Sequence, residues 1–359
     1  MIRNKTLICL IATLVLTGCE PEGASGDTPA LPYTDFFTPI PDSAIFPADN
    51  PFSDAKRTLG EFLFWDPILS GQMNVSCASC HHPDFVWADG RAFSIGVDGS
   101  GLGPGRTGQS ETVFHSPTVL NTAFTGLVSS NQTQDFLSGP YFWDLRALTL
   151  EEQAIDPIKS EEEMRSNFFT EDEIMPEIIN RLSQIPEYVS LFETAFSEDT
   201  DPINEPNIAK ALATFQRTLV TPPTRFDTFL AGDDSALTAA EVVGLNKFIN
   251  GGCTDCHSGP LLSDNDIEPD QPIQIDRPAV RTPSLRNVSL TAPYMHDGSR
   301  ATLRDAIEIY EERDDLGVTL EDDDFGDIEA FLRTLTNQEF YQAVPSAVPS
   351  QLPVGGDIN

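Results

Sequence analysis

The pattern Cys-x-x-Cys-His occurs twice in this 359-residue chain, at 77–81 and at 253–257, and constrains the fold more than any other feature. Two cysteines three positions apart in a helical turn point to the same side, so both thiols can bond to one ligand while the adjacent histidine reaches its centre. The two copies lie far apart along the chain. They therefore predict two structural units, each built around one copy.

Two kinds of site can use such pairs. Two Cys-x-x-Cys pairs could form one Cys₄ zinc site. A histidine directly after each pair is instead typical of c-type haem, in which the thiols add to the haem vinyl groups and the histidine binds the iron. We therefore expect two covalently bound haem c groups. The predicted attachment and iron-binding residues are Cys77, Cys80, His81, Cys253, Cys256 and His257. His82 is by position a bystander.

The first residues of the chain predict export. A basic start with Arg3 and Lys5 precedes an apolar run that is too short for a membrane-spanning helix. The run ends in "LTGC", which resembles the bacterial lipobox, so that Cys19 would become the lipidated first residue of the mature protein. The alternative is an ordinary signal peptide with a spare thiol. We expect a periplasmic protein anchored to a membrane by lipid, and Glu20 after the lipid site favours the outer membrane.

The charge balance limits the partners. The chain has 56 Asp and Glu against 21 Lys and Arg, a net charge of −35. This excess argues against nucleic acid and allows attraction of a basic protein, although it also fits a solvated surface.

Helix signals dominate the sequence, and alternating strand patterns are scarce. Thr238 and Glu241 form a capping box before an apolar helical stripe, which Gly251 and Gly252 end. Similar stripes cover 207–219 and 325–335, and the segment 89–121 is rich in Gly, Ser and Thr. The predicted fold class is mostly α with long loops.

The number of histidines and methionines that could bind the two haem irons limits how many of the irons can have six ligands. Of five histidines, two are proximal ligands and His82 adjoins one of them, which leaves His115 and His296. None of the five methionines lies in an obvious ligand loop. At least one iron is therefore expected to have an open or unusual distal side.

Longer motifs resemble a known family. "LGEFLFWDPILSGQMNVSCASCHHPDFVWADG", "HSPTVLNTAF", "YFWDLRALTLEEQAIDPI", "GLNKFINGGCTDCHSGP" and "RTPSLRNVSLTAPYMHDGSRATLRDAIEIY" look like successive signatures of bacterial di-haem cytochrome c peroxidases and their relative MauG. The resemblance covers residues 51 to 335 and implies two cytochrome c-like haem lobes. The expected parts are a lipoprotein signal peptide (1–18), a linker (19–50), a first, peroxidatic lobe (51–215), a second, electron-transfer lobe (216–320) and a C-terminal segment packing on the first lobe (321–359).

The resemblance assigns roles around the first haem, where hydrogen peroxide would bind. Gln153 and Glu163 match the distal residues of that haem, so Gln153 would orient peroxide and Glu163 would move a proton between its oxygens. Alternatively, Glu163 forms a capping box with Ser160. Trp143 matches a tryptophan between the two haems and would relay electrons. The alternative for Trp143 is a core aromatic residue.

The second haem is expected to have an unusual distal ligand. In the peroxidase branch a methionine lies fourteen residues after the histidine of a "PY-x-H-D-G" motif, and here that count from His296 reaches Tyr310. In MauG the matching tyrosine binds the iron. Tyr310 shares the inner stripe of a helix capped by Thr302 and Asp305, so it could also be a packed core tyrosine. As an iron ligand it would give the second haem a low potential.

The sequence also departs from the family. The loop "SIGVDGSGLGPGRTG" lacks the histidine that blocks the first iron in many relatives. Phe114-His115 replaces an Arg-Asn pair whose asparagine binds calcium together with positions matching Thr291 and Pro293, which puts a calcium ion in doubt. The segment 122–137 is expected to be an insertion.

Three functions follow as hypotheses. The first is a peroxidase that reduces hydrogen peroxide to water with electrons from a small c-type cytochrome or copper protein. The second is a MauG-like enzyme that uses peroxide to oxidise a residue of a partner protein. The third is a non-enzymatic electron-transfer cytochrome, which would need two six-coordinate irons.

Overall fold

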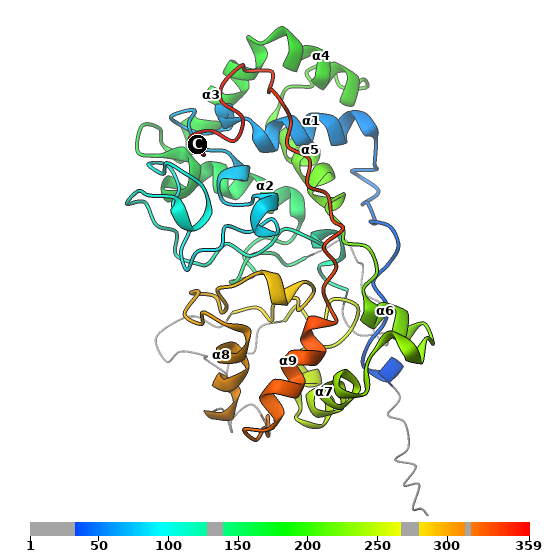
Figure 1. The fold of residues 1–359 in the computed structure, drawn as a ribbon. Coiled ribbons are helices and arrows are strands. Elements are labelled where there is room, and N and C mark those ends of the chain that lie inside the picture. Colours follow the sequence, from blue (N-terminus) through cyan, green and yellow to red (C-terminus); the bar gives the residue numbers. More distant parts are fainter. Residues whose placement is uncertain (1–32, 128–138, 267–279, 313–316) are drawn as a thin grey trace, which may run out of the picture. The chain divides into compact units, whose positions relative to one another are not determined.

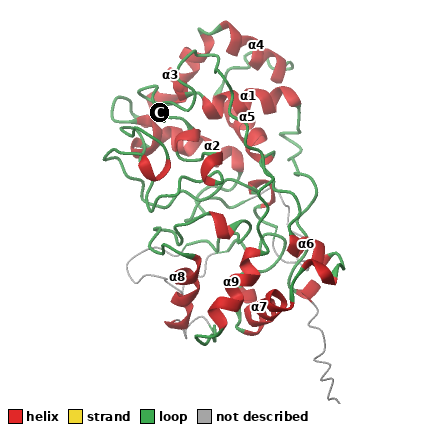
Figure 2. Ribbon diagram, in the orientation of Figure 1, coloured by secondary structure: helices red, strands yellow, loops and turns green. Residues whose placement is uncertain are grey.

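Helices joined by long loops build the part of the chain that the computed structural model describes, which is residues 33–127, 139–266, 280–312 and 317–359 (Figure 2). Within these residues extended pairing is limited to isolated bridges such as Val75 with Gly356. The mostly α prediction is therefore confirmed. No helix in these ranges is long and apolar enough to cross a membrane. The predicted signal peptide and Cys19 lie outside them.

The longer helices fall into two groups along the sequence (Figure 1). They are α1 (Asp54–Trp65), α2 (Leu150–Lys159), α3 (Glu171–Ser183), α4 (Pro186–Ala195), α5 (Glu205–Arg217), α6 (Arg225–Leu230), α7 (Ala239–Asn250), α8 (Leu303–Glu308) and α9 (Asp324–Arg333). Contacts join α1 to α5 and α4, α2 to α5 and α3, and α3 to α4, whereas α7 and α8 contact α9. These contacts define a first lobe, α1 to α5, and a second lobe, α6 to α9.

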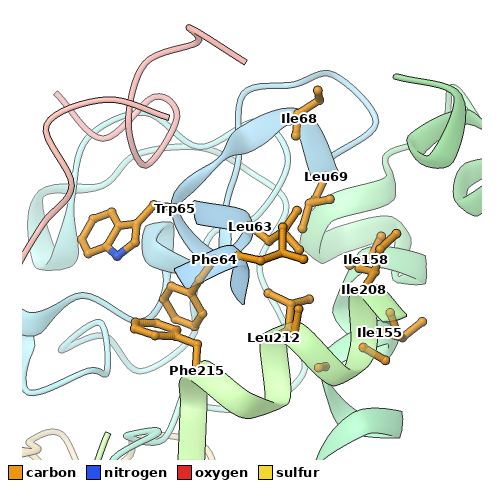
Figure 3. Packing of buried hydrophobic residues seen from close by; sticks show 14 of the residues in the cluster. Leu63, Phe64, Trp65, Ile68, Leu69, Ile155, Ile158, Ile208, Leu212 and Phe215 are labelled. Atoms are coloured by element: carbon orange, nitrogen blue, oxygen red, sulfur yellow. The ribbon is translucent and has the colours of Figure 1, made fainter. Parts of the chain in front are cut away.

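The crossing of α1 and α5 forms the centre of the first lobe. Leu63, Phe64, Leu212 and Phe215 pack between the two helices (Figure 3). Gly60 allows the close approach, because a Cβ there would lie 2.0 Å from the carbonyl oxygen of Ala211. This crossing supports the loops that follow α1, including the first cysteine motif.

The second lobe repeats this construction with α7 and α9. A Cβ on Gly244 of α7 would lie 1.8 Å from the carbonyl oxygen of Asp327 in α9. Phe248 and Phe331 pack with ring centroids 5.3 Å apart, and Phe331 packs edge-on against Phe226. The helix α7 leads directly into the second cysteine motif.

Two predicted boundaries differ from the structure. Residues 33–50 were expected in a linker, but Phe37 is fully buried against Phe226 and Phe248 of the second lobe. At the other end Asn50 is also buried, and its side-chain amide donates to Glu151 and to the carbonyl of Lys210 in the first lobe, so this segment packs on both lobes. The C-terminal segment was expected to leave for the first lobe at residue 321. Instead α9 stays in the second lobe, because its apolar face covers α7.

Only the chain after α9 packs on the first lobe, and it ends against the first cysteine motif. The hydroxyl of Ser79 donates to the carbonyl of Gly355 at 2.9 Å, and the amide of Gly355 donates to the carbonyl of Trp65 at 2.8 Å. The amide of Asp357 donates to the carbonyl of Asn74 at 2.8 Å. Figure 1 shows this returning trace in red.

Local helix signals were predicted well. The capping boxes at Thr238 and Thr302 both form, at the starts of α7 and α8. The stripe expected over 207–219 is α5, which begins two residues earlier, after an Asn204 cap.

Candidate functional site

Both cysteine motifs adopt the same turn. A short 3₁₀ helix begins at the first cysteine in each, η3 (Cys77–Ser79) and η9 (Cys253–Asp255). The amide of His81 donates to the carbonyl of Cys77 at 2.9 Å, and the amide of His257 donates to that of Cys253 at 2.8 Å. The helical turn expected from the spacing is therefore present at both motifs.

Each motif histidine is oriented by a main-chain carbonyl. Nδ1 of His81 lies 3.1 Å from the carbonyl oxygen of Trp87, and Nδ1 of His257 lies 2.9 Å from that of Leu262. Trp87 (φ 60°) and Leu262 (φ 51°) are both left-handed, which non-glycine residues seldom are. A hydrogen bond at Nδ1 leaves Nε2 as the nitrogen for a metal, the arrangement common at metal-binding histidines.

A cavity of about 650 Å³ adjoins the first motif. Cys77, Cys80 and His81 line it, and so do Gln153 and Glu163, which are distant in sequence. The structure thus brings the predicted attachment residues and the predicted distal residues to one cavity.

Glu163 lies in a short π-helical turn, η7 (Glu161–Arg165). Its amide donates to the hydroxyl of Ser160 at 3.3 Å, so the main-chain half of the predicted cap forms. The reciprocal bond from the Glu163 carboxylate is absent from the cap, and the side chain lines the cavity instead. Burial raises the pKa of the Glu163 carboxyl to about 7, and Arg146 partly opposes this shift. Such a carboxyl can both accept and return a proton near neutral pH.

Gln153 and Arg146 complete the polar wall of the first cavity. Gln153 is in the first turn of α2, where its amide donates to the carbonyl of Thr149 at 3.0 Å. The Arg146 guanidinium stacks 3.5 Å from the ring centroid of Phe142 and pairs with Asp144 at 2.8 Å. A cation is therefore held beside the predicted proton-transfer site.

A second cavity, of about 230 Å³, adjoins the second motif. Cys253, Cys256 and His257 line it, together with Tyr310 from η11 (Ile309–Glu312). The stripe of α8 that precedes Tyr310 is buried and lines the same cavity. Met295 is a further lining residue. Tyr310 thus lines the same cavity as the motif histidine, as an iron ligand would have to.

Trp143 lines both cavities. Its indole Nε1 donates to the carbonyl of His115 at 2.9 Å, and its carbonyl accepts from the amide of Arg281 at 2.7 Å. The side chain is buried, as for any core aromatic residue, but its place is between the two predicted haem sites.

His115 also lines both cavities, and one of its three hydrogen bonds, to His296, connects the two lobes. Its amide donates to the carbonyl of His296 at 2.7 Å, and its Nδ1 lies 2.6 Å from the carbonyl oxygen of Arg91. The doubtful calcium site was predicted at Thr291 and Pro293. Both residues line the second cavity and not the first. No group of three or more His, Cys, Asp or Glu side chains suited to a metal occurs in the described ranges. The calcium prediction stays untested.

The thiols suit haem attachment and do not suit a shared zinc ion. The two cysteine pairs line separate cavities, so the Cys₄ alternative is wrong. Burial raises the pKa of the Cys77, Cys80 and Cys253 thiols to about 12, so the neutral form is favoured in each. Each motif therefore offers two half-buried thiols and an oriented imidazole beside a cavity, which is the donor set of a c-type haem.

Comparisons with known proteins agree with this geometry. Residues 54–235 match the family model described as di-haem cytochrome c peroxidase. The chain belongs to the di-haem cytochrome c peroxidase family. Cytochrome c551 peroxidase of Pseudomonas aeruginosa is 35% identical over 325 residues, which cover 84% of this chain and 85% of the relative. Methylamine utilization protein MauG of Methylophilus methylotrophus is 34% identical over 291 residues, 75% of this chain and 76% of the relative.

Solved structures support the same fold. A MauG-like protein associated with microbial copper homeostasis matches with a TM-score of 0.66 at 28% identity, over 89% of this chain and 97% of that one. The di-haem peroxidase BthA of Burkholderia thailandensis shares the fold with a TM-score of 0.61 at 20% identity, over 87% and 94%. Family membership implies two c-type haems and an oxidoreductase that acts on peroxide. It does not favour the simple electron-transfer cytochrome.

Sequence reasoning missed several residues at these sites. The carbonyls of Trp87 and Leu262 could not be predicted as partners of the motif histidines. Both residues are left-handed, and a tryptophan or leucine in the sequence does not indicate that conformation. Arg146 could have been found, since it follows Trp143 in the same motif and lines the first cavity. Arg281 lines both cavities and was not singled out.

Proposed function

We propose that this protein reduces hydrogen peroxide to water, H₂O₂ + 2H⁺ + 2e⁻ → 2H₂O, with the first cavity as the reaction site. One observation carries the proposal: Glu163 and Gln153 line the same cavity as Cys77, Cys80 and His81. A carboxyl with a pKa of about 7 beside an iron-binding motif is suited to proton transfer between two peroxide oxygens.

In the proposed mechanism, Glu163 as carboxylate accepts the proton of the peroxide oxygen nearer the iron and returns it to the leaving oxygen, which departs as water. Gln153 orients the peroxide by a hydrogen bond from its side-chain amide. Arg146, which opposes the rise in the Glu163 pKa, keeps part of that carboxyl ionised near pH 7.

Cys77 and Cys80 would attach the first haem covalently, with Nε2 of His81 on its iron. Cys253, Cys256 and His257 would do the same for the second haem, and Tyr310, which lines the same cavity, would be a further ligand of its iron. When bound, the haems supply one-electron redox chemistry and the site at which peroxide is activated.

Electrons would enter at the second haem and pass by Trp143, which lines both cavities. The donor we propose is a small c-type cytochrome or copper protein with a basic docking face. A net charge of −35 favours such a partner through electrostatic steering.

Export and anchoring are also proposed, from the sequence. We infer removal of residues 1–18, lipidation of Cys19 and a periplasmic location on the outer membrane. Metabolic labelling with a fatty acid and a Cys19→Ser control would test this. Calcium at Thr291 and Pro293 is not part of the proposal, because His115 stands where relatives have a ligand.

The decisive experiment follows oxidation of a reduced small c-type cytochrome by hydrogen peroxide in the presence of the protein carrying both haems. We expect consumption of two cytochrome electrons per peroxide. A protein that binds both haems but leaves peroxide unconsumed would disprove the proposal.

A second candidate is MauG-like oxidation of a residue in a partner protein, and Tyr310 in the second cavity is the observation that favours it. In that case peroxide added to the fully oxidised protein, without any donor, would give a long-lived oxidised state. Tyr310→Phe would abolish it. A requirement for prior one-electron reduction would favour the peroxidase.

A further inference from the structure

An aromatic pair, Trp87 and Tyr341, lies next to His81 of the first cavity. The Trp87 carbonyl accepts the His81 hydrogen bond, and the Trp87 ring lies edge-on to Phe64, a lining residue of the cavity, with centroids 5.7 Å apart. Trp87 is fully buried. Its ring stacks on Tyr341 with centroids 6.4 Å apart and an interplanar angle of 22°. The indole Nε1 also donates to the carbonyl of Tyr341 at 2.8 Å.

Tyr341 connects this pair to the surface. It is half-buried, on the returning segment after α9. Its hydroxyl donates a short hydrogen bond to Oε1 of Glu61 in α1, and that carboxylate pairs with Arg57 at 3.2 Å. Burial and Glu61 raise the pKa of the Tyr341 phenol to about 12, so the resting residue is a protonated phenol with a carboxylate in contact.

This geometry suits oxidation of the phenol. A tyrosine that loses an electron becomes a very strong acid, so its oxidation is easiest when a base already holds its hydrogen bond. An indole in contact with the ring gives the electron a path toward the haem. Another half-buried tyrosine, Tyr33, donates to the neutral amide oxygen of Asn246 at 3.0 Å instead.

We propose that Tyr341, with Trp87 and Glu61, is a surface oxidation site that drains oxidising equivalents from the first haem when no donor is present. The Tyr341 phenol loses one electron, by way of Trp87, and its proton moves to the Glu61 carboxylate. The haem pair supplies the second electron that one peroxide needs. The resulting neutral phenoxyl takes up one electron and one proton from an external reductant, or couples with the Tyr341 phenoxyl of a second molecule through a new ring carbon–carbon bond to give dityrosine.

This inference rests on the proposed reaction with peroxide but uses none of its residues on the peroxide-facing wall. It predicts two routes by which electrons reach the first haem, one from the second haem by way of Trp143 and one from the surface by way of Trp87. When a donor is present, electrons arrive by the Trp143 route and Tyr341 is not oxidised.

The test treats the oxidised protein carrying both haems with hydrogen peroxide and no donor. Peptide mass spectrometry then measures oxidation at Tyr341 and at Tyr33, the matched control. We expect at least about tenfold more modification at Tyr341, the change in rate that about 1.4 kcal/mol of barrier produces. An organic radical signal in electron paramagnetic resonance should appear with wild type and with Tyr33→Phe, and be lost in Tyr341→Phe.

Two variants separate the path from a structural effect. Glu61→Gln keeps a hydrogen-bond acceptor but removes the base, so Tyr341 oxidation should fall about tenfold. Tyr341→Phe keeps the ring stack and should bleach its haems faster under peroxide, while peroxide reduction with donor stays unchanged. Equal modification of Tyr341 and Tyr33, in a protein that does reduce peroxide with donor, overturns this inference alone. Failure to consume peroxide even with donor overturns the proposed function as well.

Discussion

The two cavities are built alike on one side and differently on the other. In both, a 3₁₀ turn presents two thiols, and a left-handed residue, Trp87 or Leu262, turns its carbonyl to the histidine Nδ1. Other lining residues differ: the first cavity has Glu163 from a π-helical turn, and the second has Tyr310 from the 3₁₀ turn after α8. The two cavities therefore share the arrangement around the motif and differ in the other polar side chains that line them.

The two cavities also differ in volume and in the side chains that line them. The first cavity measures about 650 Å³ and the second about 230 Å³. Much of the second wall consists of apolar side chains of α8 and α9. A wall with a carboxyl suits proton transfer to a small polar substrate, whereas a largely apolar wall suits a haem that only exchanges electrons.

The largest expected effect comes from removing the carboxylate that distinguishes the first cavity. Glu163→Gln should lower kcat for peroxide reduction between about a hundredfold and ten-thousandfold, because the proton carrier is lost while the shape is kept. Steady-state oxidation of a reduced cytochrome measures it. Glu161→Gln is the control, since Glu161 belongs to the same turn but is exposed and pairs with Arg165. Equal losses in both variants would show that the turn, and not its acid, matters.

The second cavity can be changed to resemble that of a peroxidase with a methionine ligand. Tyr310→Met should raise the reduction potential of the second haem by on the order of 100 mV, because thioether sulfur favours the reduced iron more than phenolate does. Spectroelectrochemical titration measures the shift. Tyr294→Phe is the control, because Tyr294 lines the same cavity but bonds to the carbonyl of Val288. An unchanged potential in Tyr310→Met would mean that Tyr310 only packs.

The shared construction of the lobes can be tested through stability. Gly60→Ala and Gly244→Ala should each lower the free energy of unfolding by about 1–3 kcal/mol, because each Cβ would strike a carbonyl of the partner helix. Chemical denaturation of the protein with both haems measures this. Gly105→Ala should change little, since its Cβ would meet nothing within 4 Å. If only one of the two variants lost stability, the helix crossings of the two lobes would not be equivalent.

The smallest effect is the pH dependence of the first cavity. With the Glu163 pKa at about 7, kcat/KM for peroxide should rise with pH toward a plateau above 7 and be about tenfold below it at one pH unit under its midpoint. The pH profile of kcat/KM for Glu163→Gln should be flat in this range.

The raised pKa of Glu163 also affects stability. The free energy of unfolding should fall as pH rises from 4.5 to about 7, because the folded protein keeps a proton on Glu163 that the unfolded chain has lost.

Local features of the fold could be read from the sequence, and long-range ones could not. The caps at Thr238 and Thr302 and the cysteine turns depend on residues three or four positions apart, so their spacing specifies them. The packing of Phe37 on α7, and α9 staying in the second lobe, depend on partners distant in sequence. No local pattern specifies such contacts.

The candidate site divides in the same way. Attachment residues follow from spacing alone, whereas Gln153, Glu163, Trp143 and Tyr310 were reached through family resemblance, and the structure brings each to a predicted cavity. The sequence offered a capping box for Glu163, and only its main-chain half forms, in a π-helical turn whose Glu163 side chain lines the first cavity. The four residues of the box do not specify a π-helical turn.

The bond between Ser79 and Gly355 has a consequence for the order of assembly. These residues are 276 positions apart, so during synthesis Cys77 and Cys80 emerge long before the segment that covers their turn. Until that segment arrives, the turn that carries the two thiols lacks this hydrogen bond. An attachment enzyme would thus meet an open turn first, and the late-made tail would close over a motif already loaded.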